Sequence, residues 1–381
     1  MAFARARGSQ SRCTPARAWP AVPGRPRLAT ARPRLMSSAE IRSRFTDFFV
    51  AANYTKVESS ALVPCKNDNS LLFTNAGELD YRRRKCTPRS AACRLKSGGA
   101  RAVSLRQSFK EYFLNPDASP FQKAVSVQKC LRAGGKHNDL DNVGYTPRHH
   151  TFFEMLGNFQ FAGGACKKDT IATSWKFLTN ELNLPMDRLR VSIWRNHVGV
   201  PESRIVRRGE TDNFWSMGND GPCGPCTEVF WDTGLAVPDD ERWLEIWNLV
   251  FVQFNRVGDQ LRPLPALCVD TGMGLERLAS VLQVSSVYFC NSDFRAREIN
   301  KQSNFDIDTF SRLKADTLLL VDKFMLNVGT MVCFPAVFIC RTLPTPNQPD
   351  RDNELFRPSL HIVADHFRAV CFLIAEGVVP R

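Results

Sequence analysis

The chain has 381 residues, 43% of them hydrophobic, which is enough for one large domain or two ordinary ones with a sizeable core. Its formal net charge is +13, but residues 1–36 and 79–106 each contribute +8, so the remainder carries −3. A surplus confined to two segments is a poor argument for nucleic-acid binding by the globular body. No apolar run reaches the ~18 residues that span a bilayer. Thirteen scattered cysteines with a single C-x-x-C exclude a disulfide framework and fit a reducing compartment.

The first 36 residues hold eight arginines and no acid, a composition typical of transit peptides. We expect import into mitochondria, with the plastid as the alternative organelle. A disordered basic tail is the alternative to a leader. A second start at Met36 would give a cytoplasmic form without the leader. Downstream, the apolar spacing over residues 39–49 predicts an amphipathic helix that Ser37 or Ser38 could cap.

The rest of the chain mixes predicted strands and helices without a regular alternation. Periodicity alone cannot decide the very apolar residues 242–256, but their β-branched and aromatic content favours a strand. We predict strands at 71–77, 125–135, 149–161 and 242–256, a helix at 169–182 capped by Asp169, and a strand, glycine turn and helix over 268–282. This order favours an α+β fold, with an antiparallel sheet flanked by helices, over a doubly wound sheet.

Residues 130–158 are expected to form a strand, a polar loop and a second strand that together carry a ligand site. Arg132 ends the first strand, where its planar guanidinium could grip a phosphate or a carboxylate. Lys136 and His137 follow in the loop, where they could track a bound polyphosphate. Phe153 and Met155 share one strand face by alternation, as an aromatic plate and an apolar wall. The alternative is a solvated hairpin with a structural arginine.

The stretch D-T-G-M-G-L-E-R resembles a dinucleotide fingerprint in which arginine replaces the third glycine. We expect Gly272 and Gly274 to let the backbone turn tightly beside a ligand. One helical turn later, Arg277 could place a cation on a terminal phosphate or stack on a purine. Asp270 suits a substrate ammonium group. With Arg132, these residues describe a site for an amino acid and a nucleoside triphosphate, whereas the alternative is a surface arginine on an ordinary helix.

Long blocks of the chain are similar, in order, to one enzyme family. The blocks are LLFTNAG, CLRAGGKHNDLDNVGYTPRHHTFFEMLGNF, DNFWSMGNDGPCGPCTEVFWD, EIWNLVFVQFNR and VDTGMGLERLASVLQ. They resemble the catalytic domain of the alanyl-tRNA synthetases, which are class II aminoacyl-tRNA ligases. HIVADHFRAVCFLIAEGVVP resembles the start of the family's helical tRNA-recognition region. The similar residues are roughly 38–77, 107–283, 303–322 and 359–380.

The resemblance implies a class II aminoacyl-tRNA synthetase-like fold with six or seven antiparallel strands and flanking helices. It implies that residues 57–77, 132–154 and 272–277 are the three class II motifs. Catalysis would depend on Arg132 at the α-phosphate of ATP and the alanine carboxylate, Arg277 at the γ-phosphate, and Asp270 at the alanine amino group. ATP would also contact Lys136, His137, Phe153 and Gly274, and the alanine pocket would be lined by Met155, Trp215, Asn248, Asp270 and Gly272.

The implied reaction joins L-alanine to Mg²⁺-ATP, giving alanyl-adenylate and pyrophosphate, and then transfers alanine to the 3′ end of tRNA(Ala). The chain stops before most of the family's helical region, its editing domain and its C-terminal oligomerisation domain. We therefore expect alanine activation to survive, expect no membrane partner and leave the oligomeric state open. The alternatives are a truncated remnant that retains at most alanine adenylation and a tRNA-independent amino-acid adenylating enzyme.

Three segments have no counterpart in the family, which suggests translated introns or, alternatively, lineage-specific loops. They are residues 79–106, 284–302 and 323–358. The expected organisation is a leader over 1–36, a catalytic domain over 37–322 that contains the first two segments, the third segment, and the start of the helical region over 359–381.

The C-x-x-C of Cys223 and Cys226 begins like the zinc knuckle of some family members. The two downstream histidines that would complete the site are missing, because residues 233–236 are Thr-Gly-Leu-Ala. Two cysteines alone make half a zinc site. We therefore predict no zinc.

Overall fold

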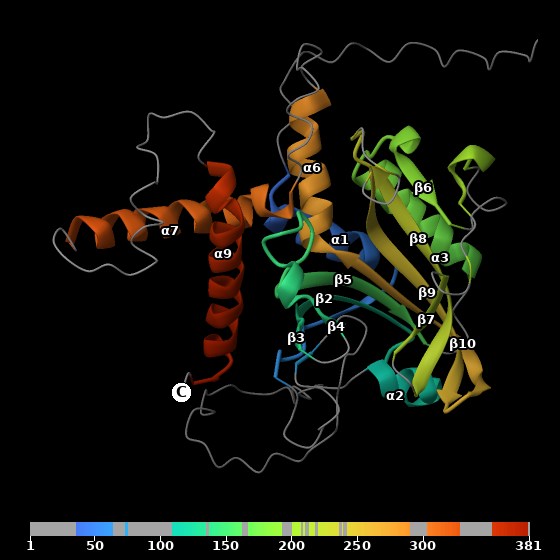
Figure 1. The fold of residues 1–381 in the computed structure, drawn as a ribbon. Coiled ribbons are helices and arrows are strands. Elements are labelled where there is room, and N and C mark those ends of the chain that lie inside the picture. The colour runs from blue at the N-terminus through green and yellow to red at the C-terminus, as the bar shows by residue number, and fades with distance from the viewer. Residues whose placement is uncertain are drawn as a thin grey trace, which may run out of the picture. The chain divides into compact units, whose positions relative to one another are not determined.

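A computed structural model shows an eight-stranded sheet flanked by helices (Figure 1), which confirms the predicted α+β fold. The strand order is β1-β2-β5-β10-β9-β8-β6, with β7 paired to β8 off this path. All described residues belong to one unit, Leu35–Arg381. The structure describes residues 36–63, 73–74, 109–134, 137–161, 167–192, 200–206, 209, 213–217, 220–235, 238, 242–289, 303–327 and 353–379.

The sheet has long central strands and short outer ones. Its members are β1 (Thr55–Val57), β2 (Lys123–Leu131), β5 (Phe152–Gln160), β6 (Leu189–Val191), β7 (Phe214–Ser216), β8 (Gly221–Asp232), β9 (Trp243–Val257) and β10 (Gln260–Gly274). A separate two-stranded piece is β3 (Ala133–Gly134) with β4 (His137–Asn138). The strands predicted at 125–135, 149–161 and 242–256 are thus confirmed as β2, β5 and β9.

The main helices are α1 (Ser38–Ala51), α2 (Phe109–Leu114), α3 (Lys167–Lys176), α6 (Leu275–Phe289), α7 (Asp308–Asn327) and α9 (Asn353–Ala375). The Ser37 side chain accepts the Glu40 backbone N–H at 3.2 Å, which confirms the predicted cap of α1. A π-helical turn, Phe177–Glu181, continues α3. Single 3-10 turns lie at Pro116–Ala118, Leu140–Asn142, Met186–Arg188, Glu202–Arg204 and Asn304–Asp306.

The two faces of the sheet receive different layers. Helices α1 and α6 pack on one face, where α1 contacts β2 and β5 and α6 contacts β5, β9 and β10. Leu156 of β5 and Met273 of β10 point into this core beside Phe45 and Trp247. Because side chains alternate along a strand, Met155 and Gly272 belong to the opposite face. That opposite face carries the candidate site.

Two local predictions are wrong. The helix predicted from Asp169 begins earlier, at Lys167, so Asp169 lies in its first turn rather than at its cap. An acid there still interacts favourably with the positive end of the helix dipole. The expected glycine turn is also absent, because Gly272 and Gly274 continue β10 and α6 begins directly at Leu275.

The outermost strand, β1, departs from the predicted antiparallel arrangement. β1 lies parallel to β2, with Thr55 opposite Ala124, while the other pairs of described strands in this sheet are antiparallel. Parallel neighbours need a crossover connection, and the long stretch of chain between these strands supplies one. Of the strand predicted at 71–77, only Phe73 and Thr74 are described, and neither is in a strand.

Most of the three unmatched segments lies outside the described residues. Within them, residues 284–289 continue α6, residues 323–327 end α7 and residues 353–358 begin α9. Among the described helices, Arg357–Ala375 is long and apolar enough to cross a membrane by length and composition. This part of α9 instead places Asp365 and Arg368, both buried, against the sheet.

Candidate active site

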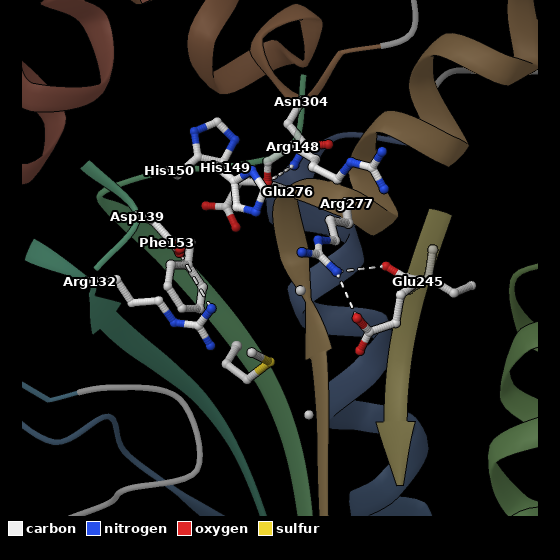
Figure 2. Close-up of a pocket in the computed structure, with 14 residues that line it drawn as sticks. Arg132, Asp139, Arg148, His149, His150, Phe153, Glu245, Glu276, Arg277 and Asn304 are labelled. Carbon is white, nitrogen blue, oxygen red and sulfur yellow. Dashed lines mark hydrogen bonds and ion pairs between the residues drawn. The ribbon is translucent and has the colours of Figure 1, made fainter. Parts of the chain in front are cut away.

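A cavity opens where β2, β5, β9 and β10 approach the start of α6 (Figure 2). Its empty volume is about 610 Å³, including space open to solvent. Three arginines and two histidines line it together with three acids, so charged groups dominate a concave site. The lining residues are Arg132, Asp139, Arg148, His149, His150, Phe153, Met155, Glu245, Ile246, Gly272, Gly274, Glu276, Arg277 and Asn304.

One wall of the cavity is formed by Arg132 and Phe153. The Arg132 guanidinium carbon lies 5.0 Å from the centre of the Phe153 ring. Its Nη1 lies 3.4 Å from a carboxylate oxygen of Asp139, the residue just before the Leu140–Asn142 turn. Figure 2 shows this guanidinium directed into the cavity beside the ring. A planar cation next to an aromatic face is suited to a nucleotide, because it offers charge to phosphate and a stacking surface nearby.

The opposite wall is formed by Arg277 and Glu245. Arg277 lies in the first turn of α6, and its Nη1 donates to the Glu245 carboxylate at 3.2 Å and to the Glu245 carbonyl oxygen at 3.1 Å. The Arg277 side chain lines the cavity and is 26% exposed. Two arginines on opposite walls thus face the same space (Figure 2).

The floor between these walls is formed by glycines of the central strands. Gly272 lies opposite Gly157 of β5 on one side and opposite Asn248 of β9 on the other. A Cβ atom on Gly272 would lie 3.0 Å from the sulfur of Met155, inside normal contact distance. Glycine here avoids that close contact rather than permitting a turn, and the missing side chain leaves room for a small ligand.

Asp270 lies two residues before Gly272 on the same strand face. It is 5% exposed, and it pairs in register with Phe159 and Val250. Burial raises the pKa of Asp270 to about 7. Within the part of the chain that the structure describes, no hydrogen bond or ion pair reaches this carboxylate. A desolvated carboxylate without a partner is unfavourable, so this position suits a cationic ligand.

Five predicted residues are not among the described residues that line the cavity. Three of them are Asp270, Asn248 and Trp215. Asn248 neighbours Gly272, and its buried Oδ1 accepts no hydrogen bond among the described residues. Trp215 of β7 packs with the apolar cluster that contains Val250. Lys136 lies outside the described residues, and His137 is described only as part of β4. The structure therefore brings together Arg132, Phe153, Met155, Gly272, Gly274 and Arg277 in one cavity.

Several lining residues escaped the analysis of the sequence. Arg148 lies at the end of the predicted polar loop, His149 at the start of the strand predicted at 149–161, and Glu245 near the start of the apolar strand β9. Burial lowers the pKa of His149, and the charges of Arg277, Arg148 and Arg132 lower it further against the opposing effect of Asp139. In the sequence, these residues differ from their neighbours only in being polar and close to apolar strands. Which of them meet is decided by strand pairing between residues that lie 32 positions apart (Glu245 and Arg277) to 145 positions apart (Arg132 and Arg277).

Magnesium chemistry fits part of this donor set. Mg²⁺ prefers carboxylate, phosphate and water oxygens, and usually arrives with a nucleotide rather than in an all-protein cage. Asp139 and Glu245 line the cavity with carboxylates that could complete the shell of such an ion. No group of three or more His, Cys, Asp or Glu positioned for a metal occurs among the described residues.

The C-x-x-C lies in β8, away from the cavity lining. Cys223 and Cys226 are both buried, and burial raises the pKa of Cys226 to about 12. A thiol held protonated is a poor metal ligand, because zinc binds the thiolate. The absence of zinc stays a prediction.

Comparison with known proteins identifies the family. Residues 104–381 match the family model described as tRNA synthetases class II (A). An alanine–tRNA ligase of Francisella philomiragia is 42% identical over 366 residues, covering 91% of this chain and 34% of that protein. The mitochondrial alanine–tRNA ligase of Dictyostelium discoideum is 42% identical over 361 residues, covering 90% of this chain and 32% of that protein. The chain spans about a third of the length of these relatives, and with most of it matched by the family model it belongs to the class II (A) tRNA synthetases.

Proposed function

We propose that the chain carries the amino-acid-activating part of an alanine–tRNA ligase, and that the cavity binds ATP with L-alanine on its glycine floor. The names of the two relatives supply the amino acid. Asp270 is the observation that carries the proposal, because its buried carboxylate lacks a partner among the described residues. An ammonium group next to Gly272 would supply that partner, and Met155 would bound the space left for a methyl group.

In the proposed reaction the alanine carboxylate attacks the α-phosphorus of ATP. The bond from that phosphorus to the bridging oxygen breaks, and its electron pair leaves with pyrophosphate. Arg132 would neutralise charge on the attacking carboxylate and the α-phosphate, and Arg277 would hold the γ-phosphate. No protein nucleophile is required, so positioning and charge neutralisation would provide the rate increase. A magnesium ion bound with ATP would add charge neutralisation on the phosphates.

Further contacts to ATP are proposed for the loop and the aromatic wall. Lys136 and His137 would follow the phosphates, Phe153 would lie against adenine, and Gly274 would let the nucleotide approach the backbone. Trp215 and Asn248 would complete the alanine pocket beside Asp270. Because a pocket for one methyl group discriminates weakly against smaller and isosteric amino acids, we expect measurable activation of glycine and serine.

In the second proposed step, a hydroxyl of the terminal ribose of tRNA(Ala) attacks the carbonyl of the adenylate and AMP leaves. This step is the more demanding one to test, because the chain spans only about a third of the length of these relatives. We also propose a mitochondrial location, supported by the acid-free arginine-rich residues 1–36 and by the relative named mitochondrial. A reporter fused to residues 1–36 that stayed diffuse in the cytosol would contradict the location.

Alanine-dependent exchange of pyrophosphate into ATP, measured on the full chain, tests the proposal. Exchange with alanine, weaker exchange with glycine and serine, and strongly reduced alanine exchange in Asp270→Asn would support it. Asp259→Asn is a matched control, because Asp259 is exposed in the β9–β10 turn. A folded wild-type chain that shows no exchange with any amino acid would overturn the proposal and favour a remnant without activity. Charging of tRNA(Ala) then separates a ligase from a tRNA-independent adenylating enzyme.

A further inference from the structure

Arg368 of α9 bridges two buried acids that come from different elements. Its Nη1 donates to Glu276 Oε1 at 2.6 Å, and its Nη2 donates to Glu154 Oε1 at 3.1 Å. The side chains of Arg368, Glu276 and Glu154 are 5%, 3% and 9% exposed. Such short, buried contacts between charged groups are strong, and breaking one side leaves an uncompensated charge.

A second arginine completes the charge balance. Arg42 of α1 donates to Glu154 through Nε at 2.7 Å and through Nη2 at 2.6 Å. Two cations and two anions therefore neutralise one another, but Glu276 has an ion pair only to Arg368 among the described residues. Removing Arg368 would leave Glu154 its pair with Arg42 and would leave Glu276 as a buried charge.

Glu276 connects this buried cluster to the cavity. It is the residue before Arg277 in the first turn of α6, and its carboxylate accepts the backbone N–H of Glu154 at 3.1 and 3.3 Å. Glu154 lies between Phe153 and Met155 on β5, so this contact fixes the start of α6 against the strand that forms the aromatic wall. Glu276 thus fixes the backbone from which Arg277 enters the cavity.

The orientation of Arg368 is fixed by aromatic rings. Its guanidinium carbon lies 4.7 Å from the ring centre of Phe152 and 5.3 Å from that of Phe310. A planar guanidinium held beside two rings can reach two carboxylates at once, which a lysine ammonium on a flexible stem cannot do with the same geometry.

We propose that Arg368 is a positioning residue for Arg277: by neutralising and orienting Glu276, it holds the first turn of α6 so that Arg277 reaches the γ-phosphate of ATP. The proposal rests on the proposed ATP site and extends it to α9, which begins the segment that resembles the helical tRNA-recognition region. Arg368 does not line the cavity, so it acts through its neighbour.

The end of α9 provides a matched control. Glu376 accepts from Lys129 Nζ at 2.6 Å and from the Leu62 backbone N–H at 2.6 Å, so it also anchors the helix to the sheet region. Neither Lys129 nor Leu62 belongs to α6. Glu376→Gln therefore weakens the docking of α9 without touching Glu276 or Arg277.

A double-mutant cycle on the full chain tests the proposal, with the dissociation constant for ATP as the first readout and the exchange KM for ATP as the second. Arg368→Met and Arg277→Ala are each expected to weaken ATP binding by about 10-fold, which corresponds to ~1.4 kcal/mol. If Arg368 acts through Arg277, the double variant is no weaker than Arg277→Ala alone. Glu376→Gln is expected to leave the ATP constants unchanged, and Arg368→Lys to fall between wild type and Arg368→Met.

The proposal would be overturned if the double variant weakened ATP binding by the product of the two single-variant factors. That result would mean that Arg368 supports only the fold. Unchanged ATP binding in a folded Arg368→Met protein would also overturn it. If Arg368→Met does not fold, the cycle is run with Arg368→Lys, for which additivity counts against the proposal in the same way. A wild type that binds ATP without alanine-dependent exchange would refute the proposed function while leaving the binding cycle decisive for Arg368. A wild type that binds no ATP would refute both.

Discussion

Arg277 and Glu245 form a hydrogen-bonded ion pair on one wall of the cavity, joining the start of α6 to the start of β9. The arginine proposed for the γ-phosphate therefore already has a partner at the edge of the site, and that partner is one of the acids that could share a magnesium ion with ATP. Ligand binding would exchange the Glu245 contact for a phosphate contact.

Replacing Glu245 separates its two roles. Glu245→Gln is expected to raise the Mg²⁺ concentration needed for half-maximal exchange, because an amide is a weaker ligand than a carboxylate. The loss in stability is expected to stay below about 1 kcal/mol, since the side chains of the pair are 26% and 36% exposed and solvent screens it. A magnesium titration of the exchange rate together with a urea unfolding curve measures both. An unchanged magnesium requirement would show that Glu245 does not coordinate the metal ion.

Glu40→Gln is the control for that experiment. Glu40 forms a comparable exposed pair with Arg44 at 3.1 Å on α1. It should have the same small effect on stability and none on the magnesium requirement.

The raised pKa of Asp270 predicts a pH profile. Only the ionised carboxylate can pair with the alanine ammonium group, so kcat/KM for alanine should rise through an apparent pKa of about 7. Exchange rates at subsaturating alanine between pH 5.5 and about 8.5 measure this limb. Asp270→Asn should be weakly active with a flat profile in the same range, and a wild-type profile that is flat across neutral pH would contradict the assignment.

The same shift predicts how stability changes with pH. The native state binds a proton at Asp270 more tightly than the unfolded chain does, because the native pKa is about 7 and the unfolded value is about 4. The contribution of this group to stability is therefore fully present below pH ~4 and is lost as pH rises through ~7. Asp270→Asn should lack this loss, so the variant should gain stability relative to wild type as pH rises from ~4 to ~7 in denaturant titrations.

Gly272→Ala tests the floor of the alanine pocket. The added methyl would contact the flexible end of Met155 at 3.0 Å, so the fold should lose less than about 1 kcal/mol. It would occupy the space proposed for the substrate, and we expect KM for alanine to rise by about 10-fold or more, as for one misplaced methyl group.

Gly258→Ala should show the opposite pattern. Gly258 adopts a φ of +57° in the β9–β10 turn, and a Cβ there would meet nothing within 4 Å. We expect a stability cost of about 1 kcal/mol from the left-handed backbone and an unchanged KM for alanine. Steady-state exchange and thermal unfolding of both variants provide the comparison, and an unaltered KM in Gly272→Ala would place alanine elsewhere.

Arg132→Lys keeps the charge but removes the planar fork that stacks on Phe153. If Arg132 stabilises charge that develops during adenylate formation, the exchange kcat should drop by about 100-fold while stability hardly changes. Arg262→Lys, on an exposed residue of β10, is the control for the chemical change. Equal kinetics in the two variants would show that Arg132 is a structural arginine.

Much of the local structure was encoded in short sequence patterns. Ser37 and the apolar spacing that follows it define α1, because capping and amphipathic burial depend on neighbours within a few turns. The β-branched and aromatic residues of 242–256 define β9 for the same local reason. The motif blocks were distinctive enough to indicate the family, which the family model confirms over residues 104–381.

The sequence could not determine which distant residues meet, because pairing depends on the register of strands and the docking of helices. The parallel pairing of β1 with β2 and the strand conformation of Gly272 follow from such pairings. The pair of Arg277 with Glu245 spans 32 positions, and that of Arg368 with Glu276 spans 92. The sequence by itself therefore determined several central elements, the family and a set of candidate residues. Only the tertiary structure decided that Asp270 is buried without a partner among the described residues and that Arg368 of α9 pairs with Glu276, because burial and charge pairing arise when remote segments pack together.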